Sequence, residues 1–116
     1  MNRRKELIEA YKQMKPDMGI YVIRNTQNHK CWLDSTQDLK SKMNRVKFQL
    51  QAGSHPVREL QKEWSEMGEG SFTIEVLEQL KYDKDESKTD YSEELAILKM
   101  VWEEKLADGA IEFYSK

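Results

Sequence analysis

The sequence predicts one small α/β domain, in which a three-stranded sheet is flanked by helices on both sides. Three short segments are rich in β-branched and aromatic residues, which favour strands. Around them, apolar residues recur at the three- and four-residue spacing of helices. The predicted order is α-β-β-α-α-β-α, and the length of 116 residues suits a single domain over 1–116.

A helix and a hairpin are the first predicted elements. Helical spacing of apolar residues predicts a helix over 3–14, and Pro16 ends it because the residue before a proline avoids the α region. The run 19–23 has no polar break, which is typical of a strand covered on both faces. The turn-rich segment 25–29 then leads to a returning strand over 30–34.

Two helices follow the hairpin. Ser35 or Thr36 is expected to cap the first, since either hydroxyl can accept a backbone N–H of the first turn. Gly53 ends this helix, Pro56 lies near the first turn of the next, and Gly68 closes it. The apolar stripes that face the core comprise Leu39, Met43, Val46 and Leu50 in the first helix and Val57, Leu60, Trp64 and Met67 in the second.

The last third of the chain predicts a strand, a loop and a helix. Residues 72–77 alternate in part between apolar and polar side chains, which favours a third strand. Residues 82–90 carry six charges and are expected to form a solvated loop. The final helix runs from about Tyr91 to Leu106, and Asp108 with Gly109 ends it. Its apolar side comprises Leu95, Leu98, Trp102 and Leu106.

Charge is distributed unevenly along the chain. Residues 1–62 hold 13 Lys and Arg against 6 Asp and Glu, whereas residues 63–116 hold 6 against 15. A basic surface is what a nucleic-acid-binding protein uses to hold phosphates. The alternative is that the oppositely charged halves attract each other within one fold or between two copies.

Cysteine usage and hydropathy set further limits. The single cysteine, Cys31, excludes an internal disulfide, and its apolar neighbours predict a core position. There is no stretch of about 18 apolar residues that would predict a membrane-spanning helix. The charged start of the chain differs from the apolar segment of a signal peptide, so we expect a cytoplasmic protein.

A longer constellation of residues connects these elements to a known family. Gly-Ile-Tyr-Val-Ile-Arg-Asn occupies 19–25, and over 18–106 the pattern resembles the GIY-YIG nuclease superfamily, including a branch of small bacterial proteins and regulator-associated domains. The resemblance implies a GIY-YIG-type sandwich with an antiparallel sheet and, in active members, DNA cleavage with one divalent metal. The matching positions are Asn28, Lys30, Ser35, Leu39, Asn44, Arg45, Gly53 to Pro56, Leu60, Gln61, Trp64, Gly68, Phe72 and Val76 to Glu78.

The resemblance also places residues of the two first strands in the family's cleft. Tyr21 retains the first-strand tyrosine, whereas Trp32 and Asp34 stand where the second strand has tyrosine and glycine. An indole N–H can donate a hydrogen bond but cannot accept a proton from a nucleophilic water. A carboxylate at Asp34 would repel a neighbouring phosphate.

Helical positions of the cleft depart from the family pattern as well. Lys42 takes the place of an arginine and keeps its charge without the bidentate fork, and Arg45 on the same face could substitute. Lys99 takes the place of the metal-binding glutamate, and an ammonium has no lone pair for Mg²⁺. Glu103 lies about 6 Å farther along the helix, and we expect it to pair with Lys99.

These departures favour a catalytically degenerate module with a binding or regulatory role. Its partner is unknown and could be a protein, a second copy or a small ligand; no catalytic residue and no bound metal are expected. One alternative is an active DNA endonuclease that uses Mg²⁺ or Mn²⁺ through a displaced ligand, Asp34 or Glu103. His29 is expected in an exposed turn, and His55 at a helix entry rather than as a base. The other alternative is a nucleic-acid-binding regulator without chemistry, with contacts from Lys40, Lys42, Arg45 and Lys47.

Overall fold

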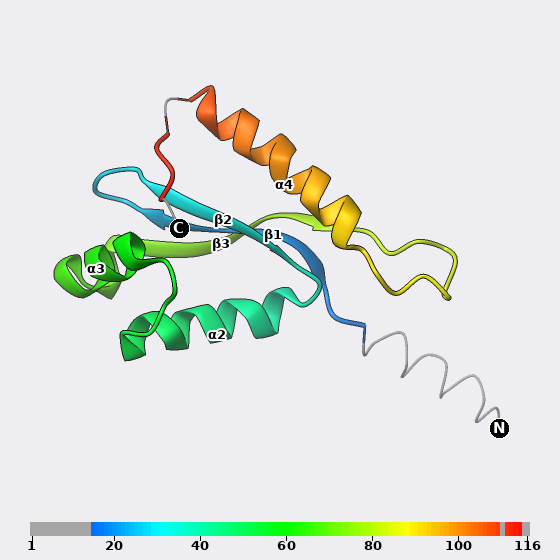
Figure 1. The fold of residues 1–116 in the computed structure, drawn as a ribbon, viewed down its shortest axis with the longest axis horizontal. Helices are drawn as coiled ribbons and strands as arrows, with labels where there is room; N and C mark the ends of the chain where they lie inside the picture. The colour runs from blue at the N-terminus through cyan, green and yellow to red at the C-terminus, as the bar shows by residue number, and fades with distance from the viewer. Residues whose placement is uncertain (1–14, 110, 115–116) are drawn as a thin grey trace.

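A computed structural model describes residues 15–109 and 111–114 of the chain. The helix predicted over 3–14 lies outside the described residues. No helix within the described ranges is long and apolar enough to cross a membrane. The elements are β1 (Met18–Asn25), β2 (Cys31–Thr36), α2 (Leu39–Ala52), α3 (Arg58–Met67), the 3-10 helix η1 (Glu69–Ser71), β3 (Phe72–Leu80) and α4 (Ser92–Ala107), in the predicted order (Figure 1).

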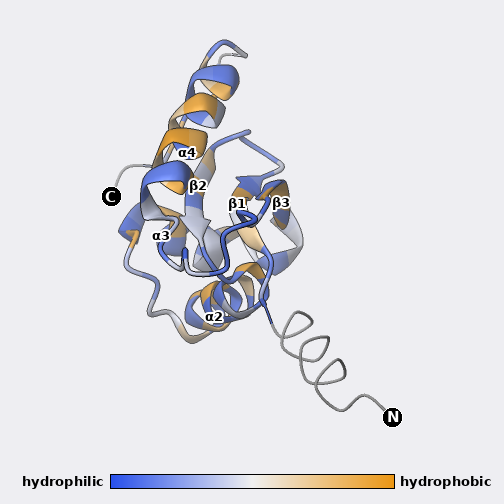
Figure 2. Cartoon of the chain, turned by 90° about the vertical axis from the view of Figure 1, so that its right-hand side faces the viewer, coloured by the Kyte–Doolittle hydropathy of each residue, from blue (hydrophilic) through white to orange (hydrophobic). Residues whose placement is uncertain are grey.

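The three strands form one antiparallel sheet in the order β2-β1-β3, which confirms the predicted fold class. β1 is the central strand and is buried along almost its whole length, as its unbroken apolar run predicts. β3 is longer than predicted, because Glu78 to Leu80 continue the pairing with β1 beyond a bulge between Ile20 and Tyr21. Helices α2 and α4 lie on opposite faces of the sheet (Figure 2).

Alternation along β1 divides its side chains between two apolar layers. Tyr21 and Ile23 point toward α2 and α3, where they pack with the stripe residues of both helices. Ile20 and Val22 point toward α4 and pack with its apolar side. Cys31 is fully buried in the α4 layer, which confirms its predicted core position.

The cap of α2 differs from the prediction. Ser35 and Thr36 still belong to β2, and the residue that caps the helix is Asp38, whose carboxylate accepts the Ser41 N–H at 3.1 Å. The Thr36 hydroxyl serves the turn instead, by accepting the Asp38 N–H at 3.1 Å. Gly53 ends α2 in the left-handed conformation, with φ 76°, as its position predicts.

The end of the chain adds a contact that no sequence pattern predicted. Phe113 pairs in parallel with Cys31 on the outer edge of β2, and the Tyr114 N–H donates to the Cys31 carbonyl at 2.9 Å. The Tyr114 side chain is buried, and its hydroxyl accepts a hydrogen bond from the buried Asn25 amide at 3.3 Å. The terminal residues therefore cover part of an edge strand that would otherwise be open.

Candidate binding cleft

A cleft of about 210 Å³ lies between α2, the α2–α3 connection and the first two strands. Five of the six residues that the sequence placed in the family's cleft line it: Tyr21, Trp32, Asp34, Lys42 and Arg45. Gln49 and His55 line it as well, although sequence reasoning did not place them there.

Strand register and helix periodicity explain why these side chains converge. Tyr21 pairs directly with Asp34 in the β1–β2 ladder, and Trp32 lies two residues before Asp34 on the same face of β2. On α2, Lys42, Arg45 and Gln49 follow one another at steps of three and four residues, so they share the flank that faces the strands.

Lys99 reaches the rim of this cleft from α4. Because β2 is an edge strand, a side chain from the opposite face can extend past it. The Lys99 Nζ lies 3.9 Å from the Asp34 Oδ1 and 5.8 Å from the centre of the Trp32 ring. The expected pairing with Glu103 is therefore wrong: in the described chain, Lys99 pairs with Asp34 across the edge of the sheet.

The Tyr21 phenol is held in its protonated form. Its side chain is only 1% exposed, and burial together with the negative charge of Asp34 raises its pKa far above the usual range. A hydrogen bond from Trp32 opposes that increase without reversing it. Tyr21 is therefore a hydrogen-bond donor in this cleft at every pH near neutrality.

Comparison with known proteins agrees with this geometry. No family model matches the chain. Intron-associated endonuclease 1 of Enterobacteria phage T4 is 34% identical over 67 residues, which are 58% of this chain and 27% of that protein. The catalytic domain of homing endonuclease I-TevI superposes with a TM-score of 0.65 and 25% identity, over 85% of this chain and 99% of that domain. A mutant of the same catalytic domain gives a TM-score of 0.63 at 26% identity, over 85% of this chain and 92% of that domain.

The chain is a homologue of this phage endonuclease and shares the fold of the I-TevI catalytic domain, which supports the GIY-YIG superfamily. It is a nuclease-like domain related to homing endonucleases, and it spans about a quarter of the length of the phage endonuclease that it matches.

The residues of this GIY-YIG domain do not fit a divalent metal ion. Of the described residues that line the cleft, Asp34 alone carries a carboxylate, and the ammonium of Lys99 lies beside it. Within 15–109 and 111–114, no group of three or more His, Cys, Asp or Glu side chains is arranged to hold a metal. Mg²⁺ and Ca²⁺ require several oxygen ligands, which this arrangement does not offer.

His55 performs the predicted helix-entry role and also faces the cleft. Its Nδ1 accepts the Val57 N–H at 3.1 Å, and its backbone N–H donates to the Gln61 side chain at 3.0 Å. Because Nδ1 is the acceptor, a neutral imidazole carries its hydrogen on Nε2 and can only donate from that atom. Burial and the charge of Lys42 lower the pKa of His55, which keeps the ring neutral. His29 lies in an exposed turn with φ 63°, as expected.

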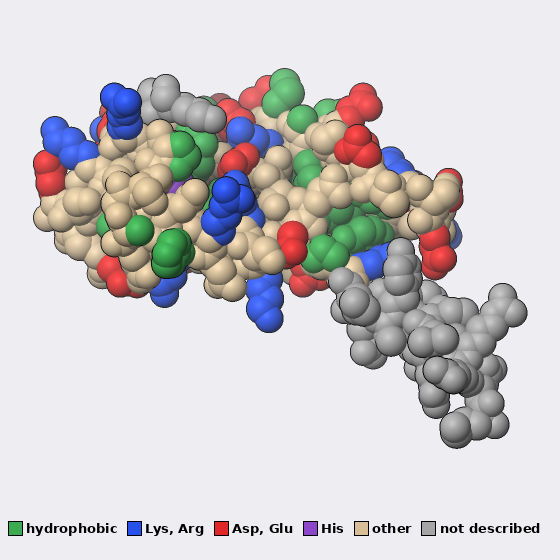
Figure 3. Space-filling model, turned by 60° about the horizontal axis from the view of Figure 1, so that its bottom comes forward, with side chains coloured by type: hydrophobic (Ala, Val, Ile, Leu, Met, Phe, Trp, Pro, Cys, Tyr) green, Lys and Arg blue, Asp and Glu red, His purple; other side chains and the backbone are tan. Residues whose placement is uncertain are grey.

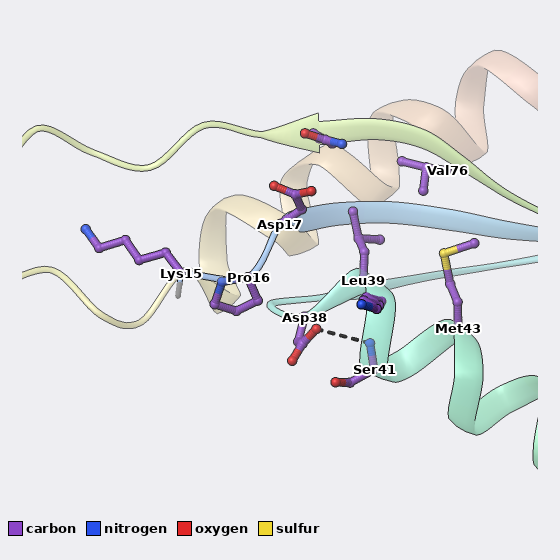
Figure 4. A pocket seen from close by; sticks show the side chains of 10 residues that line it. Lys15, Pro16, Asp17, Asp38, Leu39, Ser41, Met43 and Val76 are labelled. Atoms are coloured by element: carbon purple, nitrogen blue, oxygen red, sulfur yellow. Dashed lines mark hydrogen bonds between the residues drawn. The ribbon is translucent and has the colours of Figure 1, made fainter. Parts of the chain in front are cut away.

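The four basic residues predicted on α2 do not form one patch. Lys42 and Arg45 line the cleft, whereas Lys47 lies on the other flank and pairs with Glu69 at 3.5 Å. Lys40 borders a separate hollow of about 550 Å³ at the start of α2, beside the Asp38 cap (Figure 4). On the side of the molecule that carries α2, Lys and Arg side chains stand among hydrophobic and acidic ones (Figure 3).

Proposed function

We propose that this GIY-YIG domain is a binding module that does not cut phosphodiester bonds. The supporting observation is the Lys99 ammonium, 3.9 Å from the Asp34 carboxylate, at the position where the sequence resemblance implies the family's metal-binding glutamate. A fixed ammonium at this point repels a divalent cation and neutralises the nearby carboxylate that could have attracted one.

The other groups of the cleft also lack the chemistry to activate water. Tyr21 remains protonated, and the indole of Trp32 has no acceptor atom. The Nδ1 of His55 is occupied by the Val57 N–H, so the ring presents a donor. No described side chain of the cleft except the paired Asp34 could accept a proton from a nucleophile.

A cleavage assay tests the proposal directly. The purified chain, incubated with plasmid and with single-stranded DNA in Mg²⁺ or Mn²⁺, should leave both substrates intact. Calorimetry should detect no Mn²⁺ binding up to millimolar concentration. Cutting that disappears with EDTA and with Tyr21→Phe would overturn the proposal and support the endonuclease alternative, with Asp34 or Glu103 as a displaced ligand.

A second candidate function is nucleic-acid binding without cleavage. Lys42 and Arg45 both line the cleft, and neither forms an ion pair with another residue in the described part of the chain. Two such cations beside the protonated hydroxyl of Tyr21 suit phosphate oxygens, despite the acidic character of the second half of the sequence. Binding of labelled DNA at low salt that weakens steeply as salt is added would support this function. If low-salt titrations show no complex, the candidate is wrong.

A further inference from the structure

Phe48 is the most exposed of the large hydrophobic side chains in the described part of the chain, at 69%. A single exposed apolar residue is ordinary on a protein surface, so its neighbours decide whether it has a role. The helix neighbours of Phe48 at three or four residues are Asn44, Arg45, Gln51 and Ala52, and none of them is a large apolar side chain. Lys47, adjacent in sequence, pairs with Glu69, which also accepts a hydrogen bond from Gln51.

The position of Phe48 relative to the cleft is set by helix geometry. Phe48 follows Arg45 by three residues, which places the two Cβ atoms about 5–6 Å apart. Arg45 and Lys42 line both the cleft and an adjoining hollow of about 190 Å³ near Thr36 and Ser41. Two cations therefore lie along one flank of α2, between two hollows. The exposed ring of Phe48 lies about one helical turn from Arg45 and six residues, or about 9 Å along the axis, from Lys42.

We propose that Phe48 is a stacking platform for a base of single-stranded nucleic acid, with the phosphates held by Lys42 and Arg45. The proposal rests on the nucleic-acid-binding candidate above and names the form of the ligand. An exposed aromatic ring next to cations is the combination that single-strand binders use, since every base offers a face for stacking. Bases inside a duplex already stack on each other and leave no free face for Phe48.

The charge of α2 favours this occupant over a protein partner. Every exposed charged side chain of the helix, from Lys40 to Lys47, is positive. Lys47 is paired with Glu69, so the cations available to a polyanion are Lys42 and Arg45, which form no ion pair within the described residues. The exposed apolar residues of α4, Ile97, Met100 and Val101, lie on the opposite side of the sheet, on a helix that also carries several carboxylates. Ile97 therefore provides a matched control, because it is an exposed apolar helix residue away from the cationic flank.

Fluorescence anisotropy with the full chain and a labelled dT oligonucleotide of about 12 nucleotides tests the proposal. Phe48→Ala should weaken binding about 5- to 150-fold, since stacking on one base contributes roughly 1–3 kcal/mol and 1.4 kcal/mol is tenfold in affinity. Phe48→Trp should retain binding, and Phe48→Leu should not restore it. Ile97→Ala should bind as the unmodified chain does.

Two further readouts separate stacking from charge. The dependence of affinity on salt should keep its slope in Phe48→Ala and become shallower in Arg45→Ala, because only the arginine neutralises a phosphate. Affinity for a duplex of equal length should not change in Phe48→Ala. Equal losses on duplex and single strand, or no loss on either, would overturn the stacking role. Absence of any nucleic-acid binding would also overturn it and leave the proposal of a non-cleaving module in place.

Discussion

Replacing Lys99 by glutamate reverses the charge that lies at the rim of the cleft. The Nζ–Oδ1 separation of 3.9 Å from Asp34 corresponds to an attraction of about 1 kcal/mol in bulk water and about 4 kcal/mol at an effective dielectric constant of 20. The two side chains are 31% and 32% exposed, so solvent screening favours the lower figure. Replacing attraction by repulsion should therefore lower the free energy of unfolding by roughly 1–2 kcal/mol.

The same substitution should create a response to metal that the unmodified chain lacks. Two carboxylates would then face each other at the edge of β2, and a cation that binds only the folded state raises its stability. In thermal unfolding, Lys99→Glu should melt about 4–8 °C lower without metal, and millimolar Mn²⁺ should recover much of that difference. The unmodified chain should show no Mn²⁺-dependent change in its melting temperature.

A neutral substitution at the same position is the control. Lys99→Met removes the ammonium and its contact with the Trp32 ring but adds no carboxylate, so it should lose less stability and remain indifferent to Mn²⁺. Mn²⁺-dependent stabilisation of the unmodified chain would refute the reasoning. So would a Lys99→Glu variant that is as stable as its parent at low salt, since the contact with Asp34 would then have no energetic weight.

Three other predictions concern the fold that positions the cleft. Gly19→Ala should lower the free energy of unfolding by about 1–3 kcal/mol or more, measured as a lower urea midpoint, because a Cβ there would overlap the Glu78 carbonyl of the paired strand. Leu60→Ala should cost about 2–5 kcal/mol, since this side chain is 0% exposed in the α2–α3 layer. Stability should fall as the pH drops below the ordinary histidine value of about 6.5, because the folded state lowers the pKa of His55 and the unfolded chain takes up the proton more readily. Urea midpoints at about pH 7.5 and about pH 5.5 should differ less in His55→Asn, which has no proton to gain.

The spacing of apolar residues predicted the elements of the described chain, because the burial of one or both faces of a helix or strand determines where apolar residues occur. β1 is covered by α2 on one face and α4 on the other, so its apolar run has no polar break. The cap of α2 was not predicted correctly because three residues able to cap lie within four positions. Ser35, Thr36 and Asp38 all carry suitable oxygens, and only the end of β2 at Thr36 decides among them.

Contacts that depend on tertiary geometry were beyond the reach of sequence reasoning. The helical spacing of Lys99 and Glu103 suggests a pair along the helix, yet the edge position of β2 brings Asp34 within range instead. The strand-like contact at Phe113 is too short to show a period. Tyr114 accepts its hydrogen bond from Asn25, which lies 89 residues earlier in the sequence. The position of His55 beside Pro56 correctly predicted its role at the helix entry. Its place in the cleft was not predicted, because it depends on how α2 and α3 pack on the sheet.

Asp34 and Lys99 are the two positions where the sequence resemblance implies a glycine and a glutamate, and in the structure their charges compensate each other at 3.9 Å. A carboxylate at Asp34 without a counter-charge would face the buried Tyr21 phenol, whose pKa it already raises. An ammonium at Lys99 without Asp34 would have only the Trp32 ring as a favourable neighbour on the strand. The pair makes this side of the cleft electrically neutral and leaves Lys42 and Arg45 as its unpaired charges among the described lining residues. A cleft with that balance is suited to hold an anion and poorly suited to hold a metal ion, which supports binding without cleavage as its role.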